Sequence, residues 1–321
     1  MIDDITLLKS VHFIERDPGL DWVKDPEVSI ELDTSLDSQG ILTPNVLRLP
    51  QGGFRMYYTG IGPARPVQES QGYILSASSD DGISWRKEPG IRMDVHEPHA
   101  TLRVLCPDVI PLPDGRWRMY FEARTPNRPT VILSAVSDDG LRWQREPGIR
   151  VQSSEWSFGS PRCLYMPSPE DSQKLCYRLY FHHYSYPFRI GLDAQNNIIS
   201  AVSEDGLQFE IEPGVRVAQK DPQRESLCVY AAEVVRLGAG GYRMYYSGWS
   251  EEIHGGIFAA TSADGLHWIK DQGPLLDLDR ALDCKMVSEP CVIELADGRY
   301  RLYYEAKDIA GRARILSATS A

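Results

Sequence analysis

The sequence lacks long hydrophobic runs and clusters of positive charge. No stretch of its 321 residues holds the roughly 20 apolar residues of a transmembrane helix. Its first residues, Met1-Ile-Asp-Asp4, are neither basic nor followed by an apolar run, so we expect no signal peptide. The formal net charge is −11, and lysines and arginines form no run. We therefore expect no nucleic acid and no membrane as a partner, although a few placed cations could bind a small anionic substrate.

Cysteine pairs and the motifs of common cofactors are also missing. The six cysteines include no Cys-x-x-Cys pair, so we expect reduced, mostly buried thiols in a cytoplasmic protein. No P-loop, Gly-x-Gly-x-x-Gly fingerprint or Gly-x-Ser-x-Gly motif occurs. No acidic loop has calcium-site spacing, and His182 and His183 lack the spacing of a zinc site. We expect neither cofactor nor metal.

One short motif recurs, whereas no stretch shows convincing helical periodicity. The motif is Ser-x-Asp-Gly-x-x-Trp, with Phe as the last residue of one copy, and each copy follows an apolar run. The C-terminus stops in such a run, Ile315–Ala321, and the N-terminus supplies the missing part, Asp17–Trp22. A repeat completed by opposite ends of the chain indicates a closed ring. The four complete copies are Ser79–Trp85, Ser137–Trp143, Ser203–Phe209 and Ser262–Trp268.

Apolar residues alternate with polar residues inside each repeat. In Asp108–Glu122, a strand, a tight turn at Pro113-Asp-Gly115 and a second strand follow one another. The apolar run makes a third strand, and the Asp-Gly turn leads to a fourth. We therefore predict an all-β fold, a five-bladed β-propeller forming one domain over residues 1–321, with the N-terminal strand completing the last blade. Equivalent strand pairs are expected at Asn45–Thr59, Glu233–Ser247 and Cys291–Glu305, and a longer hairpin ends in Tyr177–His182.

The recurring motif is interpreted as scaffold. Its Gly supplies the positive φ of a turn, its Asp binds the turn backbone, and its aromatic residue packs between blades. A single functional site must instead be sought where the repeats differ.

The repeats differ where inner strands start and where second strands end, and both places should face the axis. At the strand starts, the residues on both sides of the proline are expected to lie on one strand face and to point toward the axis. The inner strands are expected to start at a proline, which needs no ladder donor there. The starts read Thr43-Pro-Asn45, Cys106-Pro-Asp108, Ser160-Pro-Arg162, Ala231-Ala-Glu233 and Glu289-Pro-Cys291. The ends read Thr59–Ile61, Glu122–Arg124, His182–Tyr184, Ser247–Trp249 and Glu305–Lys307.

Together these segments predict an axial pocket rimmed by residues 62–71, 155–158, 184–188 and 249–256. Clustered carboxylates raise one another's pKa, which can make one of them a proton donor near neutral pH. Arg124 and Arg162 could hold carboxylates ionised or bind an anion. Alternatively, the charges neutralise one another as a buried network that closes the channel. The expected pocket residues are Asn45, Asp108, Glu122, Arg124, Arg162, His182, Tyr184, Glu233, Trp249, Glu289, Glu305 and Lys307.

The blade pattern, the Asp-Gly-x-x-Trp turns and the x-Pro-x-Val strand starts, as in Cys106-Pro-Asp-Val109, resemble the propellers of carbohydrate-active enzymes. These are the arabinanases and xylosidases of glycoside hydrolase family 43, the invertases and levansucrases, and the mannoside phosphorylases of family 130. The resemblance implies an Asp before the proline in the first blades, where this chain has Thr43 and Cys106. Only Glu289 is an acid at that position.

The resemblance implies a glycoside hydrolase acting on an oligosaccharide or polysaccharide fragment, and a narrow funnel favours inversion. The expected catalytic residues are Glu233 as acid and Asp108 or Glu289 as base, and the other pocket residues would bind the carbohydrate. A phosphorylase on the same scaffold would need one acid and a cationic phosphate site. A non-catalytic carbohydrate-binding propeller is the third hypothesis. A monomer is expected in each case.

Overall fold

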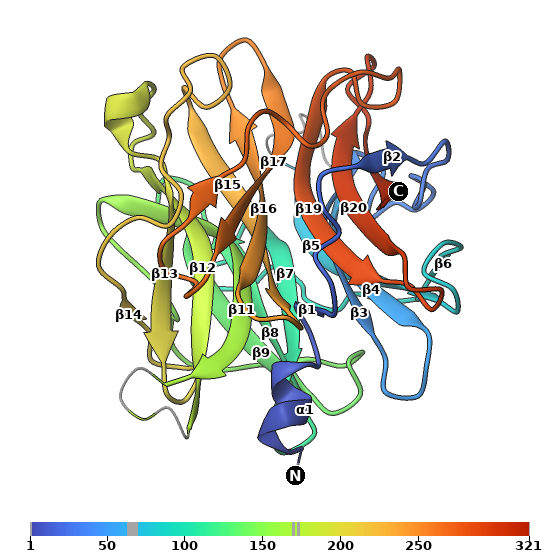
Figure 1. Cartoon of the computed structure of the whole chain (residues 1–321), viewed down its shortest axis with the longest axis vertical. Helices are drawn as coiled ribbons and strands as arrows, with labels where there is room; N and C mark the ends of the chain where they lie inside the picture. Colours follow the sequence, from blue (N-terminus) through green and yellow to red (C-terminus); the bar gives the residue numbers. More distant parts are fainter. Residues whose placement is uncertain (1, 63–69, 169–170, 172–173, 321) are drawn as a thin grey trace.

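The computed structural model describes residues 2–62, 70–168, 171 and 174–320, and it is built almost entirely of strands (Figure 1). Helical structure in this part of the chain is limited to α1 (Asp4–Leu8) and a 3-10 turn, η2 (Leu192–Ala194). The sequence predicted no helix. Helix α1 starts because the Asp3 side chain accepts a hydrogen bond of 2.9 Å from the Thr6 backbone N–H, and its Leu7 is buried in the core.

The strands pair antiparallel in groups of four, each with a short outer strand, as the alternation predicted. One further strand, β1 (Phe13–Ile14), pairs in parallel with β15. The groups are β3 (Gly40–Arg48), β4 (Phe54–Ile61), β5 (Gly72–Ser79) and β6 (Arg86–Lys87); β7 (Arg103–Pro111), β8 (Trp117–Arg124), β9 (Val131–Ser137) and β10 (Gln144–Arg145); β11 (Trp156–Pro167), β12 (Leu175–Ser185), β13 (Ile198–Ser203) and β14 (Glu210–Ile211); β15 (Cys228–Leu237), β16 (Tyr242–Trp249), β17 (His254–Ser262) and β18 (Ile269–Lys270); and β19 (Met286–Glu294), β20 (Tyr300–Lys307), β21 (Ala313–Ser320) and β2 (Trp22–Lys24).

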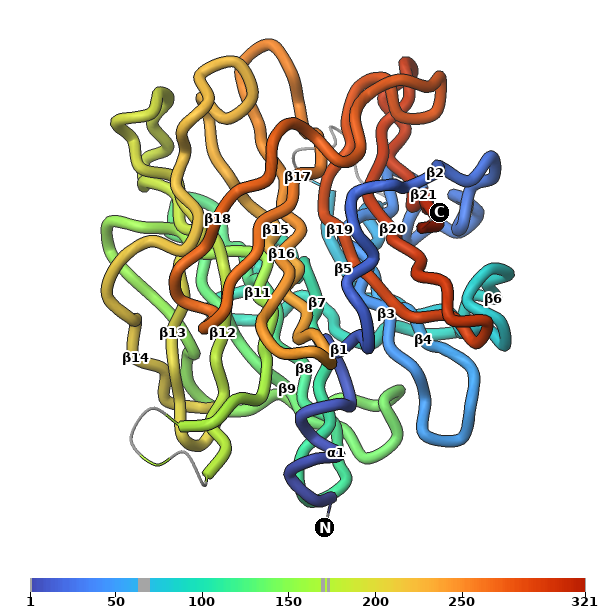
Figure 2. The backbone as a smooth tube through the Cα atoms, in the orientation of Figure 1, coloured from blue at the N-terminus to red at the C-terminus, as the bar shows by residue number. Residues whose placement is uncertain are grey.

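The two chain ends meet in one group, as predicted. Strand β2 pairs antiparallel with β21, with Val23 opposite Thr319. Figure 2 shows this N-terminal segment in blue beside the red C-terminus. The inner strands β3, β7, β11, β15 and β19 contact one another in this order, and β19 contacts β3. They therefore surround a common centre.

The recurring motif is scaffold, as interpreted. In the copy at residues 137–143, Oδ1 of Asp139 accepts hydrogen bonds of 2.8 Å from the backbone N–H groups of Leu141 and Arg142, and Gly140 has a φ of +70°. The aromatic residue of each copy meets a tyrosine of a neighbouring group edge-on, with ring centroids 5.7–6.2 Å apart. These pairs are Tyr57–Trp143, Tyr120–Phe209, Tyr180–Trp268, Tyr245–Trp22 and Tyr303–Trp85.

The predicted starts of the inner strands are wrong. Strand β7, for example, begins at Arg103, so Pro107 lies in the middle of the strand. The pairing register with β8 shifts between Leu105 and Asp108, which marks a β-bulge that tolerates a residue without an N–H donor. All inner strands share this bulge, and its residues have φ of +46° to +54°; they are Thr43, Cys106, Ser160, Ala231 and Glu289.

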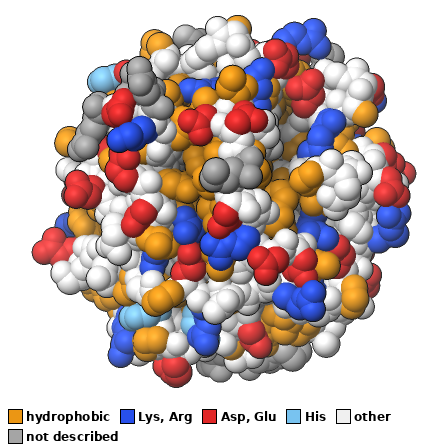
Figure 3. All heavy atoms as spheres, turned by 90° about the horizontal axis from the view of Figure 1, so that it is seen from below, with side chains coloured by type: hydrophobic (Ala, Val, Ile, Leu, Met, Phe, Trp, Pro, Cys, Tyr) orange, Lys and Arg blue, Asp and Glu red, His pale blue; other side chains and the backbone are white. Residues whose placement is uncertain are grey.

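The surface carries both signs of charge. Figure 3 shows acidic and basic side chains interspersed over one face, with no large patch of either sign. In the described part of the chain, no helix is both long and apolar enough to cross a membrane. All six cysteines are free, and only Cys284 is not fully buried.

Candidate functional site

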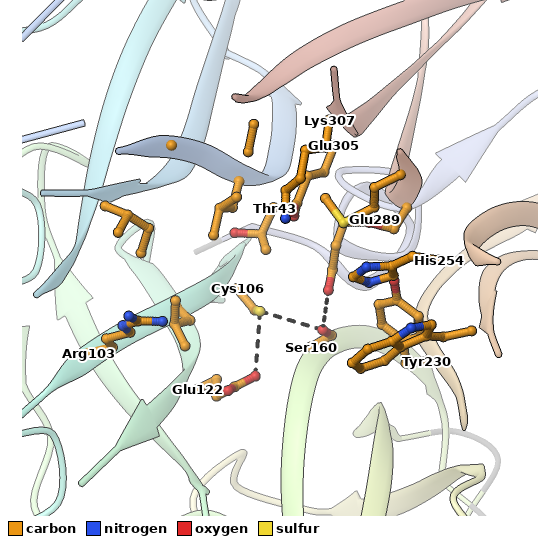
Figure 4. A pocket seen from close by; sticks show the side chains of 18 of the residues that line it. Thr43, Arg103, Cys106, Glu122, Ser160, Tyr230, His254, Glu289, Glu305 and Lys307 are labelled. Carbon is orange, nitrogen blue, oxygen red and sulfur yellow. Dashed lines mark hydrogen bonds between the residues drawn. The ribbon is translucent and has the colours of Figure 1, made fainter. Parts of the chain in front are cut away.

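A cavity of about 570 Å³ lies where the inner strands start and the second strands end (Figure 4). Its volume falls in the range of about 300–1,000 Å³ that is usual for small-molecule sites. Eight of the predicted pocket residues line it, which confirms that these strand ends converge. They are Glu122, Arg124, His182, Tyr184, Trp249, Glu289, Glu305 and Lys307.

Four predicted pocket residues do not line this cavity: Asn45, Asp108, Arg162 and Glu233. The expectation that the residues on both sides of the proline share one face is wrong. The extra residue of each bulge breaks the period of two, so the residue before the proline lines the cavity in most groups and the residue after it is buried in a separate layer.

Asp108 is fully buried and accepts hydrogen bonds from three other segments. Its Oδ1 lies 2.7 Å from Nε2 of His12 and 3.1 Å from Nδ2 of Asn45. Its Oδ2 accepts a hydrogen bond of 2.7 Å from the backbone N–H of Cys163. The carboxylate is therefore held by polar partners on both oxygens and is 0% exposed.

Glu233 and Arg162 complete the same buried layer. Nε of Arg162 donates a hydrogen bond of 2.8 Å to Glu233, and its other nitrogens donate to the carbonyl groups of Pro44, Pro107 and Pro161. Nδ1 of His12 lies 3.6 Å from Glu233. For these residues, the geometry favours the alternative of a charge network that closes the channel.

His12 is the part of this network that the sequence did not reveal. It lies between α1 and β1, in a segment that belongs to no repeat. Burial alone would lower the pKa of His12, but the carboxylates of Asp108 and Glu233 outweigh it and raise the pKa to about 10. His12 is therefore an imidazolium at neutral pH. No sequence signal distinguished it.

Glu289 is the bulge residue of β19 and the one acid among the bulge residues. Its Oε1 accepts a hydrogen bond of 2.9 Å from Oγ of Ser160, whereas its buried Oε2 has no hydrogen-bond partner among the described residues. Burial, with the nearby charges of Glu305 and Glu122, raises the pKa of Glu289 to about 8. The group is mostly protonated at neutral pH.

Two further carboxyl groups stand at the ends of second strands. Glu305 is 7% exposed, and burial raises its pKa to about 7 against the opposing effect of Lys307. Glu122 accepts a hydrogen bond of 3.1 Å from Nη2 of Arg124, and its side chain lies against the backbone of Gly159. The contact with Arg124 fixes the position of the Glu122 side chain at this end of the cavity.

A chain of contacts joins Glu122 to Glu289 through two bulge residues. Sγ of Cys106 lies 3.5 Å from Oε2 of Glu122 and 3.5 Å from Oγ of Ser160, which donates to Glu289 (Figure 4). Cys106 and Ser160 belong to the strand starts expected to face the axis, but neither was among the residues expected to form the pocket. Their position before the proline was the available signal.

Aromatic rings cover another part of the cavity wall. Trp249 is stacked on His254 with ring centroids 4.3 Å apart, and Phe188 is stacked on Trp249 at 6.5 Å. His182 and Tyr184 are stacked at 5.6 Å. Burial lowers the pKa of His182 to about 3 and that of His254 to about 4, so both rings are neutral.

The predicted rim is partly correct. Tyr184, Phe188, Trp249 and His254 line the cavity, whereas the segment 155–158 does not. The predicted rim loop 62–71 lies mostly outside the described residues. Arg103 and Tyr230, which the sequence did not indicate, also line the cavity. Within the described ranges, no group of three His, Cys, Asp or Glu side chains could hold a metal ion.

The sequence of the chain is similar to those of known proteins. A model of the glycosyl hydrolases family 32 N-terminal domain matches residues 19–166. A Mycobacterium tuberculosis (strain CDC 1551 / Oshkosh) protein, "Uncharacterized protein MT1551", is 35% identical over 261 residues, which cover 74% of this chain and 80% of that protein. The chain belongs to the same family as MT1551.

Solved structures of glycoside hydrolases have a similar fold. A structure described as "Glycoside hydrolase" has a TM-score of 0.75 at 16% identity, with 93% of this chain and 92% of that chain covered. A thermostable family-43 glycoside hydrolase has a TM-score of 0.66 at 17% identity, with 92% and 91% covered. At these identities the likeness concerns the propeller-like fold.

Proposed function

We propose that the protein is a glycoside hydrolase that cleaves a glycosidic bond of an oligosaccharide or polysaccharide fragment in this cavity. The four-stranded groups are taken as the blades of a five-bladed propeller, with β2 as the outer strand of the last blade. The observation that carries the proposal is the pair Glu289 and Glu122, two carboxyl groups in one cavity with opposite surroundings. Glycosidases need one proton-donating and one ionised carboxyl group.

Glu289 is assigned as the general acid. Its pKa, raised to about 8 by burial and by Glu305, leaves it protonated at neutral pH. Its buried Oε2 has no protein partner among the described residues and is the oxygen assigned to the proton that the leaving group receives. When the glycosidic bond breaks, that proton passes to the departing sugar oxygen and Glu289 becomes a carboxylate.

Glu122 is assigned as the general base. Nη2 of Arg124 donates a hydrogen bond of 3.1 Å to its Oε1 and orients the carboxyl group. The carboxylate would remove a proton from water as the water attacks the anomeric carbon. Asp108 and Glu233, expected from the sequence as catalytic, are assigned to the buried network instead, because both are at most 1% exposed and do not line the cavity.

Inversion of the anomeric carbon is favoured by the placement of the two groups. Glu122 comes from β8 and Glu289 from β19, and the contacts between them run through Cys106 and Ser160. Two intervening side chains favour a wide separation, and inverting enzymes need roughly 6.5–9.5 Å to admit water.

The aromatic wall is assigned to the sugar rings. Trp249 and Tyr184 line the cavity, and their ring faces are apolar, unlike the carboxyl groups. These faces offer surfaces for the C–H groups of a sugar. The neutral rings of His182 and His254 can exchange hydrogen bonds with hydroxyl groups without adding charge.

The test compares Glu289→Gln and Glu122→Gln with the surface control Glu210→Gln on a panel of aryl glycosides and oligosaccharides. Each cavity variant should lose about 10²–10⁴-fold in kcat and should keep its melting temperature within a few degrees, whereas the control stays active. Sugar binding without cleavage by the wild-type protein would contradict hydrolysis and support a binding module.

Two further measurements separate the mechanisms. Proton NMR of the first-formed sugar should show the anomer opposite to that of the substrate. Cleavage that requires inorganic phosphate and releases a sugar phosphate would identify a phosphorylase instead.

A further inference from the structure

One buried arginine outside the cavity links the inner strands to one another. Arg162 on β11 is 2% exposed, and its Nε donates a hydrogen bond of 2.8 Å to Glu233 on β15. Its Nη2 donates a hydrogen bond of 3.3 Å to the carbonyl group of Pro44 on β3. The other carboxyl oxygen of Glu233 accepts a hydrogen bond of 3.2 Å from the backbone N–H of Val292 on β19. The guanidinium group thus connects four of the five inner strands, directly or through Glu233.

The third nitrogen of this guanidinium group bridges two of the bulges. Nη1 of Arg162 donates hydrogen bonds of 3.0 Å to the carbonyl group of Pro161 and of 3.4 Å to that of Pro107 on β7, the fifth inner strand. An NH2 group carries two hydrogen atoms, so it can serve both carbonyl groups at once. Pro107 directly follows the bulge residue Cys106. Pro161 follows Ser160 in the same way, and both bulge residues line the cavity.

The same two bulge residues contact the carboxyl groups assigned to catalysis. Oγ of Ser160 donates a hydrogen bond of 2.9 Å to Oε1 of Glu289. Sγ of Cys106 lies 3.5 Å from Oε2 of Glu122. With φ of +46° and +50°, Ser160 and Cys106 hold a backbone conformation that costs free energy and persists where the surrounding structure enforces it. The hydrogen bonds from Arg162 to the next residue of each bulge contribute to this enforcement.

We propose that Arg162 is a positioning residue that fixes Glu122 and Glu289 relative to each other through the bulges that contact them. Its planar guanidinium group reaches Glu233 and the carbonyl groups of three prolines at the same time. The ammonium group of a lysine, a point charge on a flexible chain, would not hold all of them. An error of about 1 Å in the placement of a reacting group can cost about 10²-fold in rate. The inference rests on the proposed function for the roles of Glu122 and Glu289.

The experiment compares Arg162→Lys with Glu233→Gln as the matched control. Both variants disturb the same buried ion pair, but only Arg162→Lys removes the fork of donors that holds the prolines. We expect Arg162→Lys to lose about tenfold or more in kcat with little change in KM, because the aromatic wall of the cavity is untouched. Glu233→Gln should keep most of its activity. Melting curves set a temperature at which both variants are folded.

A second readout does not depend on turnover. With 13C in the carboxyl groups of glutamate, NMR titration should show a pKa of about 8 for Glu289, whose signal is identified by its absence in Glu289→Gln. The hydrogen bond from Ser160 lowers this pKa, so displacing the bulge in Arg162→Lys should raise it although the positive charge is retained. In Glu233→Gln the pKa of Glu289 should not rise, since the bulge stays in place.

Combining these changes with Ser160→Ala separates positioning from charge. If Arg162 acts through Ser160, Arg162→Lys shifts the titration of Glu289 in the wild-type background and not in the Ser160→Ala background. Should Arg162→Lys not fold, Arg162→Met combined with Glu233→Gln removes both buried charges and enters the same cycle. The effect of charge is then equal in both backgrounds, and the difference between the two shifts reports the positioning.

Each result decides the role of Arg162. A loss of kcat and a raised pKa of Glu289 in Arg162→Lys, both absent in Glu233→Gln, support positioning. Equal losses of stability and activity in the two variants, or equal shifts of Glu289 with and without Ser160, overturn it and leave Arg162 as a buried partner of Glu233. If the wild-type protein cleaves no glycoside, the proposed function fails, whereas the titration still decides whether Arg162 positions Glu289.

Discussion

Oγ of Ser160 donates a hydrogen bond of 2.9 Å to Oε1 of Glu289, although the two residues lie 129 positions apart in the chain. Both are bulge residues, with φ of +46° and +52°. Residues other than Gly rarely adopt this left-handed backbone conformation. Such local strain persists where the surrounding structure determines it, and it occurs preferentially at functional sites. The bulges thus bring together, at one point, side chains from different four-stranded groups.

Replacing Ser160 should change the protonation of Glu289. The hydrogen bond from Ser160 favours the ionised carboxyl group and lowers its pKa against the larger effect of burial. In Ser160→Ala the pKa of Glu289 should rise. The loss of kcat/KM at alkaline pH, which is expected near pH 8 in the wild type, should therefore move to a higher pH. The exposed Ser84→Ala is the control, and an unchanged alkaline loss would argue against Glu289 as the acid.

Replacing Glu305 should move the alkaline loss of kcat/KM in the opposite direction, to a lower pH. Burial is the main cause of the raised pKa of Glu289, and the charge of Glu305 is the next. Glu305→Gln removes that charge while preserving shape, so the pKa of Glu289 should fall and activity should be lost at a lower pH than in the wild type. Equal shifts in both variants would show that the alkaline loss reports another group.

Gly159 is expected to be essential for the position of Glu122. A Cβ atom at this residue would lie 2.3 Å from Oε2 of Glu122 and 2.8 Å from the His182 ring. Because the carboxyl group is the end of a flexible side chain, Gly159→Ala should displace it rather than unfold the protein. We expect a loss of kcat of about tenfold or more with a melting temperature close to that of the wild type. Full activity in Gly159→Ala would contradict the role of Glu122.

Much of the fold could be predicted from the sequence because the features that build it are local in the chain or recur along it. The Asp-Gly turns, the alternation of apolar residues and the contacts of a tyrosine with Trp or Phe recur along the chain. The pairing of Val23 with Thr319 followed from a repeat split between the chain ends. Glu122 and Glu305 were placed in the pocket because antiparallel pairing returns the second strand to the face where the first strand starts.

The bulges explain what the sequence did not reveal. One extra residue leaves no mark in a pattern of period two, so Asp108 and Glu233 were placed on the same face as Glu289. The positive φ of Glu289 decides instead that this side chain lines the cavity. His12 could not be predicted for another reason. It lies outside every repeat, and its partners Asp108 and Glu233 are 96 and 221 positions away in the chain.

His12 is expected to stabilise the protein in a pH-dependent manner. The pKa of His12 is about 10 in the folded protein, against an ordinary value of 6.5, because the carboxylates of Asp108 and Glu233 outweigh the effect of burial. A pKa raised on folding contributes stability that is fully present below pH 6.5 and is lost as the pH rises through about 10. His12→Gln removes the charge, so its destabilisation should be largest below pH 6.5 and should shrink toward pH 10.

Removing one member of a buried charge network typically costs about 3–5 kcal/mol, and we expect a value of this order for His12→Gln in urea unfolding at pH 6. The control is His267→Gln, since His267 lies 2.7 Å from Asp264 in an exposed ion pair. Exposed pairs contribute at most about 1 kcal/mol, so this control should change stability little at any pH. A destabilisation of His12→Gln that is the same at pH 6 and pH 10 would mean that His12 acts through packing and not through its charge.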